Sequence, residues 1–223
     1  MQFDIGIHTI IILVGPSQSG KSTWANIFQE KITQLDKELR VSVISSDAIR
    51  RELLGANLDR YDPKMMEASE AAFDMLFSKL KAVTQYPVNN EFIIIDTTGL
   101  DTEFRKKIQD HAKTVCYRTA IVAFDYAHSE YFKDLVGFDA KHIVGKHVDT
   151  FKKGVLPSIK RKSYDYSLTV KEKSLENWNN MSVNVVDYTL WRRCNFTQSS
   201  INIEQDIMII GDVHEHMTPV NQL

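Results

Sequence analysis

The stretch of sequence that decides the fold runs from residue 8 to residue 22. It reads His8-Thr-Ile-Ile-Ile-Leu-Val14, followed by Gly15-Pro-Ser-Gln-Ser-Gly20-Lys21-Ser22. The apolar, β-branched run before Gly15 is typical of a strand buried on both faces of a parallel sheet. After Ser22, apolar residues recur at spacings of three and four, which predicts an amphipathic helix: Trp24, Ile27, Phe28, Ile32, Leu35 and Leu39. The stretch therefore predicts a strand, a glycine loop and a helix.

The same alternation of strand and helix continues along the chain. Strands are predicted at residues 41–45, 92–95 and 118–124, and helices at 62–86 and 101–114. Residues 128–161 are predicted to be mostly helical, and short strands are predicted at 164–170 and 183–186. Strands alternating with helices require right-handed crossovers. The predicted fold class is therefore α/β, a three-layer sandwich with a mostly parallel sheet.

The glycine loop matches the phosphate-loop pattern of Gly, four residues, then Gly-Lys-Ser/Thr. Backbone N–H groups of such a loop surround phosphate oxygens, and the following helix N-terminus adds positive partial charge. Lys21 is expected to bridge the β and γ phosphates of ATP, and the Ser22 hydroxyl to bind Mg²⁺. The alternative is a tight turn without a ligand. The residues expected to bind the nucleotide are Gly15, Ser17, Ser19, Gly20, Lys21, Ser22 and Thr23.

A second segment with polar side chains follows the second predicted strand and reads Ser45-Ser-Asp47-Ala-Ile-Arg50. Asp47 could accept a proton from an attacking hydroxyl, and Arg50 could hold a phosphate of the acceptor. The alternative is a helix start in which a serine is the N-cap, Asp47 lies in the first turn and Arg50 is exposed.

The third predicted strand ends at Asp96, the position from which phosphate-loop proteins direct a carboxylate toward the Mg²⁺ shell. Asp96 is therefore a candidate metal-binding residue. Arg105, on the following helix, is expected to pair with Asp96 or to face solvent.

The order of these three motifs resembles the kinase domain of the polynucleotide 5′-kinase family, and it is most similar to the bacterial kinase–phosphatase proteins of RNA repair. The resemblance implies a P-loop NTPase-type kinase domain at residues 1–194, with a helical lid at approximately 128–162. It implies ATP and Mg²⁺ as cofactors and a 5′-hydroxyl nucleic-acid end as the acceptor. It also assigns catalytic roles to Asp47, as the group that activates the hydroxyl, and to Arg50, as the contact to the acceptor's phosphate, beside Lys21.

The end of the chain resembles the start of a calcineurin-type metallophosphoesterase domain. After a polar linker at 195–205, residues 206–223 contain a strand-like run and Gly211-Asp212-Val-His214. Carboxylate and imidazole ligands suit Mn²⁺, so Asp212 and His214 are expected metal ligands, the alternative being a solvated turn. No phosphatase activity is expected from this chain alone, because only nine residues follow His214.

The chain departs from the family in the lid. The family carries arginines soon after the fourth strand, whereas residues 126–136 contain none. Substitutes could come from Lys141, Lys146, Lys152, Lys153, Lys160 and Arg161. The histidines at 128, 142 and 147 are expected to be surface or core residues. Two alternatives stay open. One is a small-molecule or nucleoside kinase of the same fold, which would not need a positive groove, and the other is a non-catalytic ATP-binding module, which would explain the missing lid arginines.

Composition limits the partners and the cellular compartment that can be expected for the protein. Twenty-seven Lys and Arg against 29 Asp and Glu give a formal charge of −2, so nucleic acid would have to bind at a local site. The apolar run at 10–14 is too short to span a membrane, and no secretory signal precedes it. A cytoplasmic protein without membrane contact is expected. Its two cysteines, Cys116 and Cys194, are expected to be buried, unreactive thiols.

Overall fold

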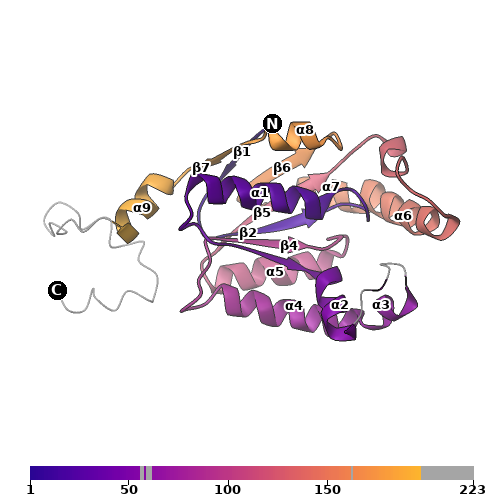
Figure 1. Cartoon of the computed structure of the whole chain (residues 1–223), viewed down its shortest axis with the longest axis horizontal. Coiled ribbons are helices and arrows are strands. Elements are labelled where there is room, and N and C mark those ends of the chain that lie inside the picture. Colours follow the sequence, from indigo (N-terminus) through magenta and orange to yellow (C-terminus); the bar gives the residue numbers. More distant parts are fainter. Residues whose placement is uncertain (56–57, 59–61, 162, 197–223) are drawn as a thin grey trace, which may run out of the picture. The chain divides into compact units, whose positions relative to one another are not determined.

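The central element is a five-stranded parallel sheet with the strand order β3-β4-β2-β5-β6. The computed structural model describes residues 1–55, 58, 62–161 and 163–196 (Figure 1). The buried run from the first motif is the central strand of this sheet and pairs with β4 and β5. The strands are β2 (Thr9–Val14), β3 (Val41–Ser45), β4 (Phe92–Asp96), β5 (Arg118–Phe124) and β6 (Tyr166–Val170). The predicted α/β class with a mostly parallel sheet is confirmed.

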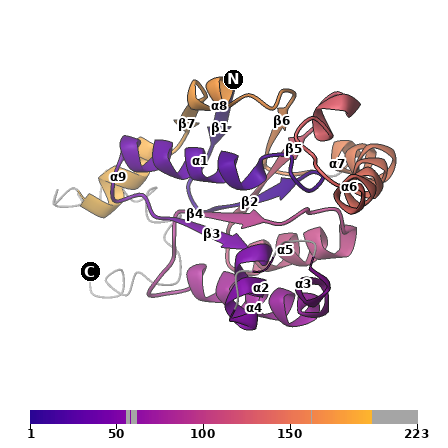
Figure 2. The same ribbon diagram turned by 45° about the vertical axis from the view of Figure 1, so that its right-hand side comes forward.

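Helices cover both faces of the sheet, which explains why every residue of β2 is buried. Helix α1 (Lys21–Leu35) lies on one face, and α4 (Ser69–Val83) and α5 (Thr102–Thr114) lie on the other (Figures 1 and 2). Alternate residues of β2 point to opposite layers, as the period of a strand requires. Ile10, Ile12 and Val14 belong to the apolar cluster that includes α4 and α5. Aromatic rings fill the α1 side, among them Phe3, Trp24, Phe28, Phe92 and Phe124.

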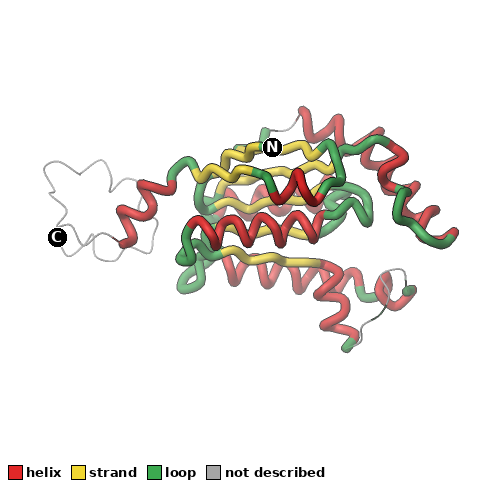
Figure 3. The backbone as a smooth tube through the Cα atoms, turned by 45° about the horizontal axis from the view of Figure 1, so that its top comes forward, coloured by secondary structure: helices red, strands yellow, loops and turns green. Residues whose placement is uncertain are grey.

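A second, two-stranded parallel sheet joins β1 (Gln2–Ile5) to β7 (Ser182–Val185), and its strands lie beside one another in Figure 3. The chain divides into two compact units, Met1–Val186 and Asp187–Leu223. The described structure of the second unit contains α9 (Tyr188–Phe196). The other helical segments are α2 (Ser46–Leu54), α3 (Pro63–Glu67), η1 (His128–Tyr131), α6 (Phe138–Thr150), η2 (Phe151–Val155, a π-helix), α7 (Leu156–Arg161) and α8 (Leu175–Asn179).

Several predicted boundaries differ from the structure. The first helix ends at Leu35, and Leu39 is buried after a turn instead of extending the helix. The predicted helix at 62–86 is two helices, α3 and α4, because the backbone leaves the helical region at Ala68. The predicted linker at 195–205 begins inside α9, since residues 195 and 196 are helical. The rest of that linker and the strand-like run after it lie outside the described residues.

Both cysteines are exposed, so the expectation of buried thiols is wrong. Cys116 occupies the turn between α5 and β5 with a positive φ of 56°, and the turn directs it away from the core. Of the helices in the described part of the chain, none is long and apolar enough to cross a membrane.

Gly99 fixes the loop that follows β4. Its φ is +59°, and a Cβ at this position would lie 2.5 Å from the backbone oxygen of Leu13 in β2. Gly55 has a similar φ of +61°, but a Cβ there would meet no described atom within 4 Å. The two glycines therefore share the conformational constraint and differ in the space around them.

Replacing Gly99 should consequently cost more stability than replacing Gly55. We expect Gly55→Ala to lower the free energy of unfolding by about 1 kcal/mol, the cost of a left-handed backbone in a residue with a Cβ. Gly99→Ala should cost at least about 2 kcal/mol more, because the backbone of β2 cannot move aside. Urea unfolding of both variants measures the difference, and equal losses would contradict the steric argument.

Candidate functional site

The phosphate-loop residues lie between the carboxyl end of β2 and the start of α1, where the sequence places them. Gly20 has a φ of +84°, and a Cβ there would come within 2.5 Å of the indole ring of Trp178. Trp178 belongs to α8 and is only 2% exposed. The Tyr126 hydroxyl donates a hydrogen bond to the Ser19 carbonyl oxygen at 2.8 Å. Side chains distant in sequence therefore support the loop from beneath.

The Lys21 ammonium group lies over this loop. Its Nζ donates to the carbonyl oxygens of Gly15 and Pro16, at 3.0 and 2.6 Å, and to the hydroxyl of Ser19 at 3.3 Å. Lys21 is only 7% exposed, so its charge is held inside the loop. Such an arrangement of amides and one ammonium suits the phosphates of a nucleotide.

Ser22 and Asp96 meet where the loop faces β4. The Ser22 hydroxyl donates to Asp96 Oδ2 at 2.6 Å. Burial raises the pKa of the Asp96 carboxyl above its usual range, although the Ser22 hydrogen bond and the nearby Lys21 ammonium act in the opposite direction. A hydroxyl and a buried carboxylate fit Mg²⁺, which prefers oxygen ligands and would compensate the negative charge.

Asp47 and Arg50 lie on the first turns of α2, beside the same edge of the sheet. Because Ser45 is in register with Asp96, the start of α2 is next to the end of β4. Arg50 Nη1 pairs with Asp47 Oδ1 at 2.8 Å, and the guanidinium also contacts the Ser69 hydroxyl and the face of Phe73.

This arrangement combines parts of both readings of the segment. The Ser45 hydroxyl does accept from the Ala48 amide as the helix N-cap, as the second reading required. The Arg50 side chain, however, is only 13% exposed, so the expectation of an exposed arginine is wrong. The Asp47 carboxylate also lies close enough to Asp96 to affect its pKa.

Arg105 neither pairs with Asp96 nor faces solvent, so both expectations for it are wrong. It is 0% exposed. Its guanidinium donates to the carbonyl oxygens of Gly99 and Asp101 and to the hydroxyls of Thr102 and Ser158. The buried guanidinium therefore joins the loop after β4 to α7. It holds the loop that follows Asp96 without lying in the site itself.

The lid residues are anchored at the end of β5. Lys152 forms an ion pair with Asp125 and donates to the Tyr126 carbonyl oxygen at 2.6 Å. Lys171 pairs with the other oxygen of Asp125 at 2.6 Å. Of the remaining basic candidates in the lid, Lys153 pairs with Asp149 on the same helical surface. The others are exposed: Lys141, Lys146, Lys160 and Arg161.

One residue that the sequence interpretation set aside lies at the phosphate loop. His147, in α6, forms a hydrogen bond between its Nδ1 and the Ser17 hydroxyl at 3.0 Å. Burial and, to a smaller extent, the Lys21 ammonium lower the pKa of His147 below its usual range. No spacing pattern could have linked two residues 130 positions apart.

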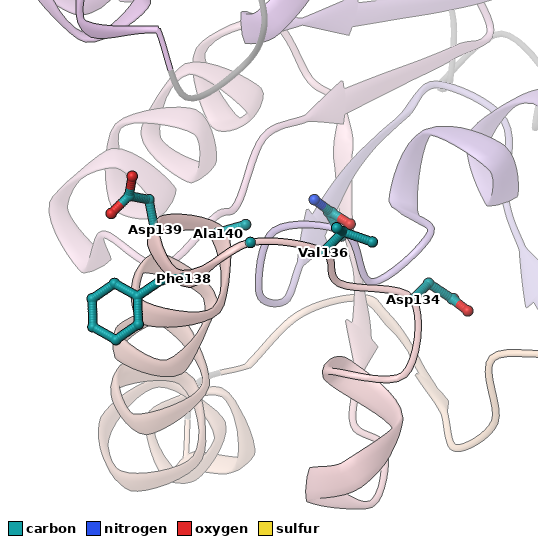
Figure 4. Close-up of a pocket in the computed structure, with 7 residues that line it drawn as sticks. Asp134, Val136, Phe138, Asp139 and Ala140 are labelled. Carbon is teal, nitrogen blue, oxygen red and sulfur yellow. The ribbon is translucent and has the colours of Figure 1, made fainter.

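A pocket of about 440 Å³ opens beside the loop (Figure 4). The phosphate-loop residue Gln18 lines one side, and the segment that leads into α6 lines the other. This segment contributes Asp134, Val136, Gly137, Phe138, Asp139 and Ala140. Asp134 pairs with Lys173 at 2.6 Å, so Asp139 is the carboxylate that makes this side of the pocket unfavourable for a polyanion.

The remaining predicted site residues are placed as follows. Thr23 is exposed on the first turn of α1. Asp212 and His214 lie outside the described residues. Within the described ranges, no group of three or more His, Cys, Asp or Glu side chains is arranged to hold a metal ion.

Comparison with known proteins agrees with this fold. The model of the family described as AAA domain matches residues 10–137, more than half of the chain. A candidate kinase of Chloroflexus aurantiacus is 14% identical, with a TM-score of 0.50 over 85% of this chain and 98% of that one. The PezAT toxin–antitoxin system of Streptococcus pneumoniae is 15% identical, with a TM-score of 0.50 over 91% of this chain and 83% of that one. These likenesses show the fold, and no curated protein matches in sequence.

The raised pKa of Asp96 predicts that its charge opposes folding. Asp96→Asn should therefore increase the free energy of unfolding at pH 7, where the wild-type carboxyl is ionised in the unfolded chain. The gain should disappear below the unfolded pKa, at about pH 4, because the wild-type group is then protonated in both states. Urea unfolding at pH 7 and pH 3 tests this, with Asp101→Asn as a variant outside the site. A loss of stability at pH 7 would contradict it.

Proposed function

The chain belongs to the AAA domain family, and we propose that it transfers the terminal phosphate of ATP to the 5′-hydroxyl of a polynucleotide. One observation supports this proposal above all others. The phosphate loop, the Ser22–Asp96 pair and the Asp47–Arg50 pair all lie at the carboxyl edge of one parallel sheet. Open α/β sheets bind their ligands at this edge.

The nucleotide side of the proposed site consists of the loop, Lys21, Ser22 and Asp96. Loop amides and the Lys21 ammonium would hold the phosphates. Ser22 and Asp96 would hold Mg²⁺, whose contribution is to neutralise charge on the transferred phosphate. The hydrogen bond between Ser22 and Asp96 keeps both oxygens in place before the metal binds.

Asp47 is the proposed general base. In the reaction, the acceptor oxygen forms a bond to the γ-phosphorus, and the bond between that phosphorus and the β–γ bridging oxygen breaks. The acceptor's proton passes to Asp47, and ADP leaves with the bridging oxygen. Arg50, whose Nη1 lies 2.8 Å from Asp47 Oδ1, orients the Asp47 carboxylate before the proton arrives.

Arg50 is the proposed contact to the acceptor. Its guanidinium is held by Ser69 and by the ring of Phe73, so its direction is fixed. A guanidinium fork binds phosphate in two parallel hydrogen bonds. A polynucleotide end offers such a phosphate next to its 5′-hydroxyl, and this supports the polynucleotide acceptor together with the order of the motifs.

A small acceptor is the second candidate function, and the pocket beside Gln18 favours it. Its volume of about 440 Å³ suits a small molecule. Of its two carboxylates, Asp134 is paired with Lys173 at 2.6 Å, and Asp139 would repel a polynucleotide that passed on this side of the loop.

Transfer of labelled γ-phosphate separates these functions. We expect the protein to label 5′-hydroxyl oligonucleotides of RNA or DNA with higher kcat/KM than nucleosides. Lys21→Ala should abolish the transfer, because losing a charged contact to the transferred phosphate costs several kcal/mol of transition-state stabilisation. Labelling of nucleosides alone would support the small acceptor, and ATP binding without any transfer would contradict both enzymatic functions.

Two substitutions in α2 should have different kinetic effects. Asp47→Asn should lower kcat by about 100-fold with little change in KM for ATP, because a general base acts on the chemical step. Arg50→Ala should impair oligonucleotides more than nucleosides, since only the former carry a phosphate for it. Arg51→Ala, at the neighbouring position, is the control. Equal impairment of both acceptors by Arg50→Ala would contradict the contact to phosphate.

A further inference from the structure

His147 is the side chain of α6 that reaches the phosphate loop. Its Nδ1 lies 3.0 Å from the hydroxyl of Ser17. The Lys21 ammonium is close enough to contribute to the lowered pKa of the imidazole. Lys21 is the residue expected to contact the β and γ phosphates. His147 is therefore at the end of the loop where the terminal phosphate of a nucleotide would lie.

The helix that carries His147 is firmly seated. Its neighbours in sequence and along the helix face, Val144 and Val148, are buried, as is Phe151 one turn later. Beyond them, Lys152 joins the same helical segment to Asp125 and to the Tyr126 carbonyl oxygen. The ring is thus presented to the loop by packed structure and needs little ordering to reach a ligand.

The ring also has a hydrogen-bonding position to offer. An imidazole has two nitrogens, and the hydrogen bond to Ser17 uses one of them. The other nitrogen can donate to an anion. In the segment that follows β5, residues 126–136 contain no arginine that could donate to such an anion.

We propose that His147 contacts the terminal phosphate of the bound nucleotide and supplies the lid's hydrogen bond to it. This inference rests on the proposed nucleotide site and adds a residue to it. Ser17 orients the ring through Nδ1, and Nε2 donates to a phosphate oxygen. Because that oxygen belongs to the group being transferred, His147 would act on a triphosphate and not on a diphosphate.

Binding measurements test the contact without requiring catalysis. We expect His147→Ala to raise the dissociation constant for a non-hydrolysable ATP analogue about tenfold or more, and that for ADP no more than about threefold, in the presence of Mg²⁺. His147→Gln, which keeps a side-chain donor, should recover part of the loss. His142→Ala, an exposed histidine on the same helix, should change neither constant.

The outcomes distinguish this inference from the proposed function. Equal weakening of both nucleotides would show that His147 only supports the fold, and unchanged binding would also overturn the inference. If His147→Ala does not fold, the same comparison is made with His147→Gln, whose selective loss for the triphosphate is expected to be smaller but measurable. If the wild type phosphorylates no 5′-hydroxyl end while the selective loss persists, the acceptor is wrong and the His147 contact stands. A wild type that binds neither nucleotide would overturn both.

Discussion

Parallel pairing of the buried strand Thr9–Val14 with both of its neighbours is the constraint on which the rest of the structure depends. Parallel strands end at the same edge, so the residues that follow them meet whatever their separation in sequence. Ser22, Asp47 and Asp96 belong to three successive strand–helix units and come together for this reason. The apolar character of β2 thus places the polar chemistry of the site.

The sequence was informative wherever a local pattern determines the structure. The strands at 41–45 and 118–124 have the predicted bounds because both are short segments rich in β-branched residues. β1 was not predicted, since its alternation of polar and apolar residues spans only four positions and its partner, β7, lies near the other end of the described chain. The positions of Arg105 and His147 depend on tertiary packing alone. No spacing rule in the sequence relates residues that belong to different strand–helix units.

Polar contacts from α6, η2 and α7 attach the lid segment to the nucleotide site. His147 contacts the loop, Lys152 contacts Asp125 at the end of β5, and Ser158 contacts the buried Arg105. Within the described residues, Arg105 pairs with no carboxylate and donates to carbonyl and hydroxyl oxygens, so its position depends on the loop after β4 keeping its shape. A change in that loop would therefore affect Asp96, which directly precedes it, and also the lid segment, which Arg105 contacts through Ser158. The site is better described as one polar network than as separate motifs.

The packing of Trp178 against Gly20 has a consequence for synthesis of the protein. The phosphate loop leaves the ribosome well before α8, yet its support comes from Trp178 of that helix, near the end of the first unit. The pairing of β1 with β7 also joins segments far apart in the sequence, because β1 can pair only after β7 has been synthesised. A nascent chain that stops before residue 175 has the loop sequence without the indole beneath it. The loop therefore gains its support only after α8 has been synthesised, long after its own residues.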